Sequence, residues 1–474
     1  MHNSTLPSAS HAALWQRIQD RSAKIGIIGL GYVGLPLALT FHDAGYDVTG
    51  FDLDPQKIER LRRGESYIRH IGLEAVGAAS RSPRFHATGD MDRLSAMDAI
   101  LICVPTPLDA KRQPDLHYVE NTARDIARRL RPGQLIILES TTYPGTTEEV
   151  VVPILESSGM ICRESAAPRT LAAVVAGQSV PVGQGQVAAD QAARAYIAYS
   201  PEREDPGNKQ FTTRIIPKVV GGLDAPSSAL ATALYGAAFQ QVIPVSSARV
   251  AEMTKILENT YRCVNIALMN ELNQLCRRMD IDIYEVIDAA STKPFGFHPF
   301  YPGPGMGGHC IPIDPFYLSW KARDYDFTTR FIELAGEINV EMPYKVAELV
   351  AHSLNRQGRA LHGARLLILG VAYKRDIDDL RESPALKVME LLMKNGAMVH
   401  YHDPHCPRIE PSRHYNFHME SRSFSPPQAA EYDGIVIMTD HSMLDYAAIA
   451  SHARLLVDTR NATRGLSGSH IVRL

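Results

Sequence analysis

The sequence predicts an α/β protein with two Rossmann-like, doubly wound domains joined by a central, mainly helical domain. Short apolar runs alternate with segments of helical periodicity in residues 24–147, and a similar alternation returns in residues 364–440. Residues 246–279 carry helical periodicity alone, which indicates a helical segment between two parallel sheets. We place the three domains at residues 1–243, 244–342 and 343–474.

The composition is that of a globular protein with several cores. The 474 residues are 45% hydrophobic and 21% charged. Their formal charge of -3 excludes the basic surface typical of nucleic-acid or anionic-membrane binding. No apolar run approaches the roughly 20 residues of a membrane span, and residues 1–20 resemble a frayed end or short cap helix more than a signal peptide. The six cysteines form no CxxC pair, so we expect reduced thiols and a cytoplasmic protein.

The first element is a strand, a glycine turn, a helix and a second strand over residues 24–52. Gly29, Gly31 and Gly34 form a GxGxxG pattern directly after the first strand, and Asp52 ends the second strand 23 residues after Gly29. Such glycines let the backbone approach a pyrophosphate at a helix N-terminus. A carboxylate at position 52 would bind ribose hydroxyls and repel a 2′-phosphate, which favours NAD over NADP. The alternative is that the glycines serve only close packing of strand and helix.

Two further buried strands are expected at residues 98–107 and 133–147, each followed by a polar loop where open α/β sheets bind ligands. Residues 163–194, rich in Ala, Gly, Gln and Val, are interpreted as a surface insertion.

The central helix, residues 246–279, carries two stripes. Its apolar face recurs at steps of three, four and seven, at Val250, Met253, Leu257, Val264, Leu268 and Leu272. Beside it runs a polar stripe of Glu252, Lys255, Asn259 and Arg262. The stripe is either a solvated face or part of a partly buried site, and mid-helix Asn and Thr favour the second reading.

A glycine-rich loop surrounds Cys310 in residues 297–315. A thiol can add to an aldehyde, and the thiohemiacetal can lose hydride to give a thioester that water cleaves. The alternative is an inert, buried cysteine. His309 is adjacent in sequence and is expected to point away from the thiol, which argues against a Cys–His dyad.

The C-terminal half resembles the N-terminal pattern closely enough to suggest a repeat, although two unrelated α/β units would also share it. Within it, VHYHDPHC contains His400, His402, His405 and Cys406. These could be metal ligands, but no further ligand group is evident in the sequence, so we interpret them as a strand end and turn beside Asp403 and expect no metal.

Six motifs occur in an order that resembles the UDP-glucose/GDP-mannose dehydrogenase family over residues 24–460: GLGYVGLP, VPTP, SPEREDPGN, the Lys255 helix, GPGMGGHCIPIDP and YKRDIDDLRESPA. The third and fifth are most similar to the UDP-N-acetylglucosamine 6-dehydrogenase branch. The resemblance implies NAD-dependent, four-electron oxidation of the C6 alcohol of a UDP-N-acetylhexosamine to the uronic acid.

The resemblance also implies roles for individual residues. Cys310 matches the nucleophile, Lys255 the lysine that stabilises the oxyanion, and Glu202 the base for thioester hydrolysis. Asn259 would donate its amide to the same oxyanion, Asp314 would hold a water with Lys255, and Thr141 would orient that water. The expected cofactor-binding residues are Gly29, Gly31, Tyr32, Val33, Gly34, Asp52, Thr106, Arg381 and Arg460. The expected substrate-binding residues are Arg203, Lys255, Asn259, Tyr301, Gly305 and Lys374.

Several alternatives stay open. UDP-glucose, UDP-ManNAc and UDP-GalNAc are rival substrates, and a catalytically silent nucleotide-binding regulator is the rival class. A β-hydroxyacid dehydrogenase shares the fold and a helix lysine but needs no thiol. The family implies a homodimer through the central helix. The stretch STKPFGFHPF lacks the arginine that many relatives contribute across subunits, so only Lys293 or His298 could take that place.

Overall fold

The computed structural model describes residues 9–68, 71–109, 113–163, 193–204, 213–308, 311–412 and 415–474. Most of the expected insertion at 163–194 lies outside these residues, as do His309 and Cys310. The chain divides into two compact units, Met1–Ile256 and Leu257–Leu474, and each is described by itself. The three domain boundaries expected from the sequence stay a prediction.

The first unit is built on an eight-stranded sheet with the order β3-β2-β1-β4-β5-β6-β7-β8. All neighbouring strands are parallel except β6 and β7. Its elements are α1 (Ala9–Gln19), β1 (Lys24–Ile28), α2 (Gly34–Asp43), β2 (Asp47–Phe51), α3 (Pro55–Arg62), α4 (Leu73–Ser80), β3 (Phe85–Thr88), η1 (Met91–Ala96), β4 (Ala99–Ile102), α5 (His117–Ala127), β5 (Leu135–Leu138), η2 (Thr147–Val151), α6 (Val152–Glu156), β6 (Tyr196–Tyr199), β7 (Lys218–Gly222), α8 (Ala225–Gly236) and β8 (Val242–Val245).

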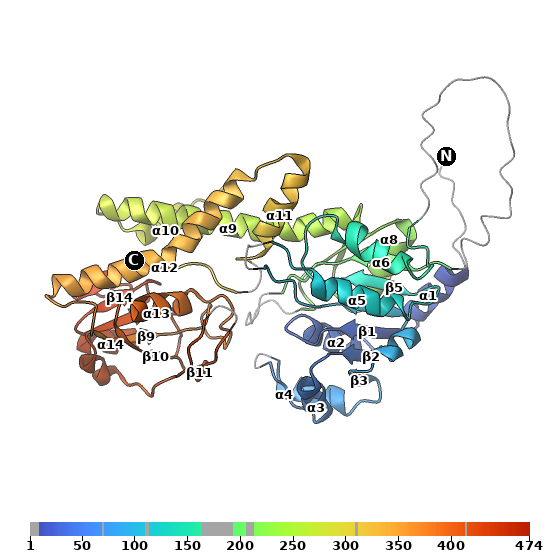
Figure 1. Ribbon diagram of the computed structural model, residues 1–474, viewed down its shortest axis with the longest axis horizontal. Coiled ribbons are helices and arrows are strands. Elements are labelled where there is room, and N and C mark those ends of the chain that lie inside the picture. Colours follow the sequence, from blue (N-terminus) through green and yellow to red (C-terminus); the bar gives the residue numbers. More distant parts are fainter. Residues whose placement is uncertain are drawn as a thin grey trace, which may run out of the picture. The chain divides into compact units, whose positions relative to one another are not determined.

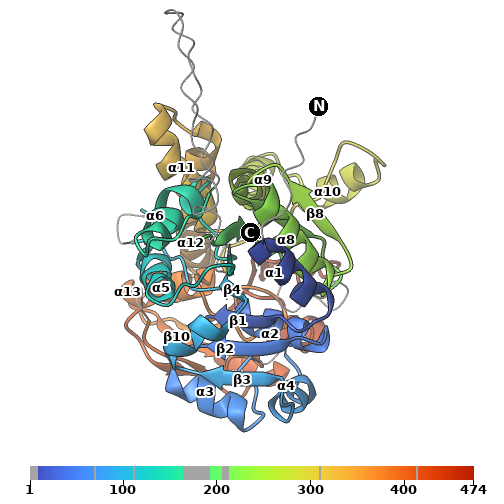
Figure 2. The same ribbon diagram turned by 90° about the vertical axis from the view of Figure 1, so that its right-hand side faces the viewer.

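Helices cover both faces of this sheet, with α5 and α6 on one side and α1, α2 and α8 on the other (Figure 2). The central strands read AILI and LIIL and are buried along their whole length, as expected for strands covered on two faces. Helix α1 is the cap helix expected near the N-terminus, because Leu14 and Ile18 are fully buried in the first core.

The second unit contains a five-stranded, fully parallel sheet with the order β10-β9-β13-β14-β15. Helices α12 and α13 pack on one face of it, and α14 with η4 on the other (Figure 1). Its elements are α10 (Ile283–Ser291), α11 (Asp314–Ala322), η3 (Arg323–Tyr325), α12 (Arg330–Arg356), β9 (Arg365–Leu369), α13 (Pro384–Lys394), β10 (Met398–His402), β11 (Arg408–Ile409), β12 (Met419–Glu420), η4 (Pro426–Glu431), β13 (Gly434–Ile437), α14 (Tyr446–His452), β14 (Leu456–Asp458) and β15 (Ile471–Arg473). The predicted fold class is confirmed.

Helix α9 (Ala248–Arg278) spans 31 residues and contains the boundary between the two units. The first three residues of its polar stripe are buried, whereas the apolar stripe is largely exposed. Glu252, Lys255 and Asn259 are 0%, 7% and 5% exposed, while Leu257 and Leu268 are 58% and 45% exposed. The interpretation of the stripe as a solvated helix face is therefore wrong for Glu252, Lys255 and Asn259, and right for Arg262. Among the described residues, every helix is too short or too polar to span a bilayer.

Candidate active site

The glycine turn between β1 and α2 is shaped by close backbone contacts. Gly29 has a φ of 92°, and a Cβ on Gly34 would lie 1.8 Å from the carbonyl oxygen of Gly29. Both glycines are therefore required by the packing itself, as the alternative reading held. Gly31 differs, because a Cβ there would meet no described atom within 4 Å. The turn thus leaves open space at its middle glycine, where a pyrophosphate would lie against the N-terminus of α2.

Asp52 follows β2 and lies at the same carboxyl edge of the sheet. Its Oδ2 accepts hydrogen bonds from the backbone N–H of Leu30 at 2.9 Å and from Lys57 Nζ at 3.1 Å, and its Oδ1 accepts one from the N–H of Asp54 at 2.9 Å. A carboxylate has about four lone-pair sites. Three donors leave room for one more, and the expected role of Asp52 toward a ribose hydroxyl stays a prediction.

The other expected residues of the first unit gather at this edge. Thr106 is buried in the loop after β4, and Thr141 is half-buried after β5. Tyr32 and Val33 are half-buried in the glycine turn, and Val33 immediately precedes α2. Because the carboxyl ends of parallel strands meet at one edge, the topology brings these residues together as predicted.

Glu202 follows β6 and is held at both carboxylate oxygens. Its Oε1 accepts the backbone N–H groups of Arg203 at 2.7 Å and Glu204 at 2.6 Å, and its Oε2 lies 3.5 Å from Lys218 Nζ. Its side chain is 14% exposed, so the carboxylate is sheltered yet reachable. Arg203, expected to bind substrate, donates from Nη1 to the carbonyl of Pro217 at 2.7 Å, and its substrate role stays a prediction.

A buried ion pair that the sequence did not predict contacts Glu202. Lys218 Nζ is 2.6 Å from Glu139 Oε2, and the hydroxyl of Tyr235 donates to Glu139 Oε1. Burial raises the pKa of Glu139. Burial lowers the pKa of Lys218, but Glu139 and Glu202 outweigh it, so the net shift is upward and the lysine stays charged.

Glu252, at the start of α9, anchors the loop that follows Thr141. It accepts the N–H of Gly145 at 2.5 Å, and the N–H and hydroxyl of Thr147 at 2.9 and 2.6 Å. Burial raises its pKa to about 7, although these hydrogen bonds act in the opposite direction. Lys255, one turn further along α9, is also buried.

In the second unit, Asn259 and Asp314 form a direct pair. Asn259 Nδ2 donates to Asp314 Oδ2 at 2.6 Å, and both residues are buried. Asp314 is the first residue of α11. The structure therefore brings two expected catalytic residues together, with the Asn259 amide committed to a carboxylate instead of facing open space.

The glycine-rich loop before Cys310 is held by a hydrogen bond from its backbone to a buried asparagine side chain. The N–H of Gly303 donates to Asn270 Oδ1 at 2.9 Å, and Asn270 Nδ2 donates to Asn339 Oδ1 at 2.9 Å. Gly305 has a φ of 127°, and a Cβ there would lie 3.1 Å from Pro384. Tyr301, also expected to bind substrate, is 47% exposed on the same loop. The buried Asn270–Asn339 pair is a second support that the sequence analysis missed.

The expected basic residues surround this loop in the second unit. The N–H of Gly308 donates to the carbonyl of Arg381 at 2.9 Å, and the Arg381 guanidinium pairs with Asp379. Arg460 is half-buried against Gly303, and burial lowers its pKa. Lys374 is also half-buried. The roles of Arg381 and Arg460 toward the cofactor, and of Lys374 toward the substrate, stay predictions.

One histidine of the VHYHDPHC stretch joins a cluster that the sequence did not reveal. Ligand atoms of Asp376, His405 and His441 all lie within 4.8 Å of one another. However, His441 Nδ1 accepts the N–H of Asp376 at 3.0 Å, and its Nε2 bonds to Asp403 Oδ2 at 3.0 Å. Because both ring nitrogens of His441 are engaged, we interpret the cluster as structural.

The missed residues left only weak signals in the sequence. Glu139 stands at a strand end, a position typical of functional groups, and Asn270 continues the polar stripe of α9 at helical spacing. Lys218 opens a strand and carried no signal of its own.

Three segments of the chain match domains of one family. Residues 23–239 match the NAD binding domain of the UDP-glucose/GDP-mannose dehydrogenase family, residues 249–341 its central domain, and residues 367–465 its UDP binding domain.

Individual relatives are similar over nearly the whole chain. A UDP-N-acetyl-D-glucosamine 6-dehydrogenase of Pseudomonas aeruginosa is 33% identical, covering 89% of this chain and 91% of that protein. A UDP-N-acetyl-D-mannosamine dehydrogenase of Methanococcus maripaludis (strain C7) is 31% identical, covering 88% and 86%. The solved structure of a UDP-D-ManNAc dehydrogenase from Pyrococcus horikoshii matches with a TM-score of 0.79 at 30% identity, covering 95% of this chain and 98% of that one.

Proposed function

Because the chain belongs to the UDP-glucose/GDP-mannose dehydrogenase family and is an NAD-dependent nucleotide-sugar 6-dehydrogenase, we propose that its substrate is UDP-N-acetylglucosamine, oxidised at C6 to the uronic acid. UDP-N-acetylmannosamine is the second candidate, because relatives named for either sugar are similar to a comparable degree. UDP-N-acetylgalactosamine and UDP-glucose are further rivals.

The observation that carries the catalytic proposal is the pattern of burial on α9, where polar side chains are buried and apolar side chains are exposed. Lys255 and Asn259 are buried on a helix that leaves three leucines exposed, Leu257, Leu268 and Leu275. Burying an ammonium and an amide while apolar side chains face outward opposes folding, and such arrangements are typical of functional sites.

The proposed mechanism assigns one task to each residue. NAD supplies the hydride acceptor for both oxidation steps. After the first oxidation, the Cys310 thiol adds to the C6 aldehyde, and Lys255 stabilises the oxyanion, a type of contribution worth about 3 kcal/mol of barrier. The second oxidation leaves a thioester on Cys310. A water oriented by Thr141 then attacks the thioester, Glu202 accepts its proton, and the thiolate leaves.

The experiment supplies NAD with UDP-GlcNAc, UDP-ManNAc, UDP-GalNAc or UDP-glucose and follows NADH absorbance. Two NADH per UDP-GlcNAc, with little from the others, is the expected result. Faster turnover of another sugar would replace the substrate, and no NADH from any would overturn the proposal. Cys310→Ala should bind NAD but form no carboxylate, whereas Cys276→Ala, at a half-buried cysteine of α9, should stay active.

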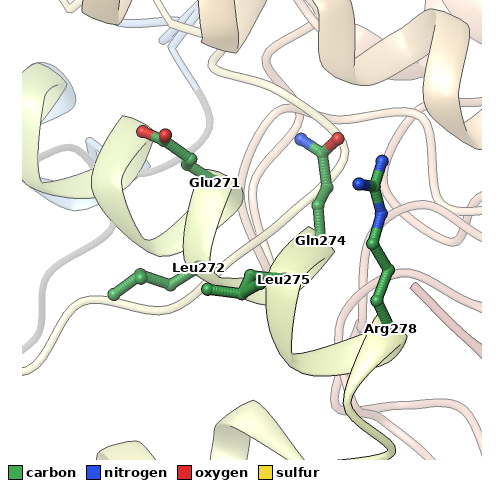
Figure 3. Close-up of a pocket in the computed structure, with 5 residues that line it drawn as sticks. All are labelled: Glu271, Leu272, Gln274, Leu275 and Arg278. Atoms are coloured by element: carbon green, nitrogen blue, oxygen red, sulfur yellow. The ribbon is translucent and has the colours of Figure 1, made fainter.

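We also propose a homodimer through the exposed stripe of α9. The hollow in Figure 3 lies along this helix, lined by Glu271, Leu272, Gln274, Leu275 and Arg278. All five residues come from α9, so the hollow is a groove on one helix and suits a second copy better than a small molecule. Leu268→Glu should give monomers by light scattering at micromolar concentration, while Lys394→Glu, on the exposed face of α13, should leave the dimer intact.

A further inference from the structure

Lys218 lies in the core of the first unit and contacts Glu202. It is the first residue of β7 and only 3% exposed. Its Nζ is 2.6 Å from Glu139 Oε2, 3.1 Å from the carbonyl oxygen of Pro201 and 3.5 Å from Glu202 Oε2. An ammonium has three N–H donors. Each of the three therefore has an oxygen within reach, and one of these oxygens belongs to the proposed hydrolytic base.

Among the described residues, the Lys218 ammonium is surrounded by two carboxylates, a phenol and a thiol, while the guanidinium of Arg203 donates to the carbonyl of the preceding residue, Pro217, at 2.7 Å. Glu139 faces the ammonium from the end of β5, Glu202 from the loop after β6, Tyr235 from α8 and Cys103 from the end of β4. Burial raises the pKa of the Cys103 thiol and of the Tyr235 phenol, so both stay neutral. One cation is thus shared between two carboxylates.

A purely structural role explains this arrangement poorly. A buried ion pair adds little stability compared with well-packed apolar residues, because both charges lose their hydration. The Lys218–Glu139 pair would also be complete without Glu202. The contact from Lys218 to the loop after β6 instead links the pair to a residue whose position matters for chemistry.

We propose that Lys218 is a positioning residue for Glu202, holding Oε2 in place, while Glu139 supplies the counter-charge that retains the ammonium in the core. Two backbone N–H groups already fix Oε1, so Lys218 completes the orientation of the side chain. This inference rests on the proposed function. In the hydrolysis step of that mechanism, water forms a C–O bond to the thioester carbon, Glu202 takes the proton, and the C–S bond breaks to release thiolate.

The test compares E139Q with the double variant E139Q/K218M, which differ only at Lys218. Neither leaves a fully buried, unpaired carboxylate at position 139, so both are expected to fold. The readouts are the rate of the first oxidation, the rate of thioester hydrolysis, and the fraction of acylated protein by intact mass after quenching. A misplaced catalytic group can slow its own step by about 100-fold. We therefore expect thioester hydrolysis to be about 10- to 100-fold slower in the double variant than in E139Q, with acyl-enzyme accumulating while the rate of the first oxidation stays unchanged.

Two further variants sharpen the result. E139Q alone should hydrolyse the thioester at a rate close to that of the unaltered protein, because Lys218 still contacts Glu202. Tyr235→Phe removes a hydrogen bond to Glu139 without changing charge, and should leave the rate of hydrolysis unchanged.

The outcomes separate this inference from the proposed function. Absence of NADH with the unaltered protein would overturn both. Two NADH per sugar with the same rate of thioester hydrolysis in E139Q and E139Q/K218M would overturn the role of Lys218 alone. An equal fall in the rates of the first oxidation and of thioester hydrolysis would also overturn it, since that is the signature of a structural residue.

Discussion

The two large sheets share one arrangement, a glycine after one strand (β1 or β9) and an aspartate after its neighbour (β2 or β10), but the two aspartates have different numbers of hydrogen-bond partners. Asp52 accepts hydrogen bonds from three donors, the N–H groups of Leu30 and Asp54 and the ammonium of Lys57. Asp403 accepts from five, the backbone N–H groups of Val371, Ala372, His405 and Cys406 and the ring of His441. Since a carboxylate has about four lone-pair sites, Asp403 is saturated and Asp52 is not.

The difference between the two aspartates follows from how soon a helix begins after the glycine of each sheet. In the first unit, α2 begins at Gly34, directly after the glycine turn. In the second, β9 ends at Leu369 and α13 begins only at Pro384, with its N-terminus capped by Ser383. Among the described residues of the second unit, no helix begins directly after this glycine, and Asp403 binds the N–H groups of the turn. The same strand arrangement can thus leave an acceptor site on its aspartate or use all of them within the loop.

The largest expected effect is on stability. Asp403→Asn should destabilise the second unit by about 3 to 5 kcal/mol, because the amide offers one oxygen to five donors. At about 2 to 4 °C per kcal/mol, this lowers its Tm by about 10 °C in thermal unfolding. Asp52→Asn, the matched change in the first unit, should lower the Tm by less than about 3 °C. Equal losses of Tm in the two variants would contradict the difference that we infer between the two aspartates.

The next effect is a pair of opposite pH dependences. Burial raises the pKa of Asp403, but His441 and the N–H groups outweigh it and hold it at about 2, below the value near 3.9 of an unfolded chain. Its contribution, about 2 kcal/mol, is present above pH 4 and is lost as pH falls toward 2. Glu252, with a pKa raised to about 7, contributes below about pH 4.3 and loses that stability as pH rises through 7.

Thermal unfolding from pH 2 to 8 measures both. Asp403→Asn should flatten the acid slope, and Glu252→Gln the slope between pH 4.3 and 7. A Glu252→Gln profile parallel to that of the unaltered protein would show that Glu252 does not set the neutral slope.

The third effect is on cofactor affinity. Asp52→Asn should raise the Kd for NAD about 10- to 100-fold, as expected for loss of hydrogen bonds from ribose to a charged acceptor. Asp403→Asn, measured by the same calorimetric titration below its unfolding temperature, should stay within about twofold. A comparable loss in both variants would mean that the second aspartate also contacts the nucleotide.

The smallest effect concerns the partners of the two aspartates. Lys57 is 34% exposed in its ion pair with Asp52, so Lys57→Met should change stability by less than about 1 kcal/mol. His441 is fully buried, and His441→Ala should unfold the second unit at a clearly lower temperature. Similar Tm losses for Lys57→Met and His441→Ala would contradict the view that only the pair of Asp403 and His441 contributes substantially to stability.

The sequence predicted what depends on spacing along the chain. The glycine turn and Asp52 lie within one strand–helix–strand unit, and helical periodicity alone places Lys255 and Asn259 on one face. It could not tell which face of α9 would be buried, because that depends on packing partners. Nor could it find contacts made across the sheet, since Lys218 and Glu139 are 79 residues apart and meet only through the strand order.

The histidines show the same limit. His405 and His441 lie on different strand ends, and only the parallel pairing of β9 with β10 and β13 brings them together. Residue spacing within VHYHDPHC therefore carried no information about the cluster that forms.

The open space at Gly31 makes it the informative glycine in a mutational screen. Alleles altered at Gly29 or Gly34 would be scored as losses of protein abundance, because any side chain there collides with the backbone. A Gly31→Val allele would accumulate normally while losing dehydrogenase activity. Position 31 is thus where selection for cofactor binding can be separated from selection for folding.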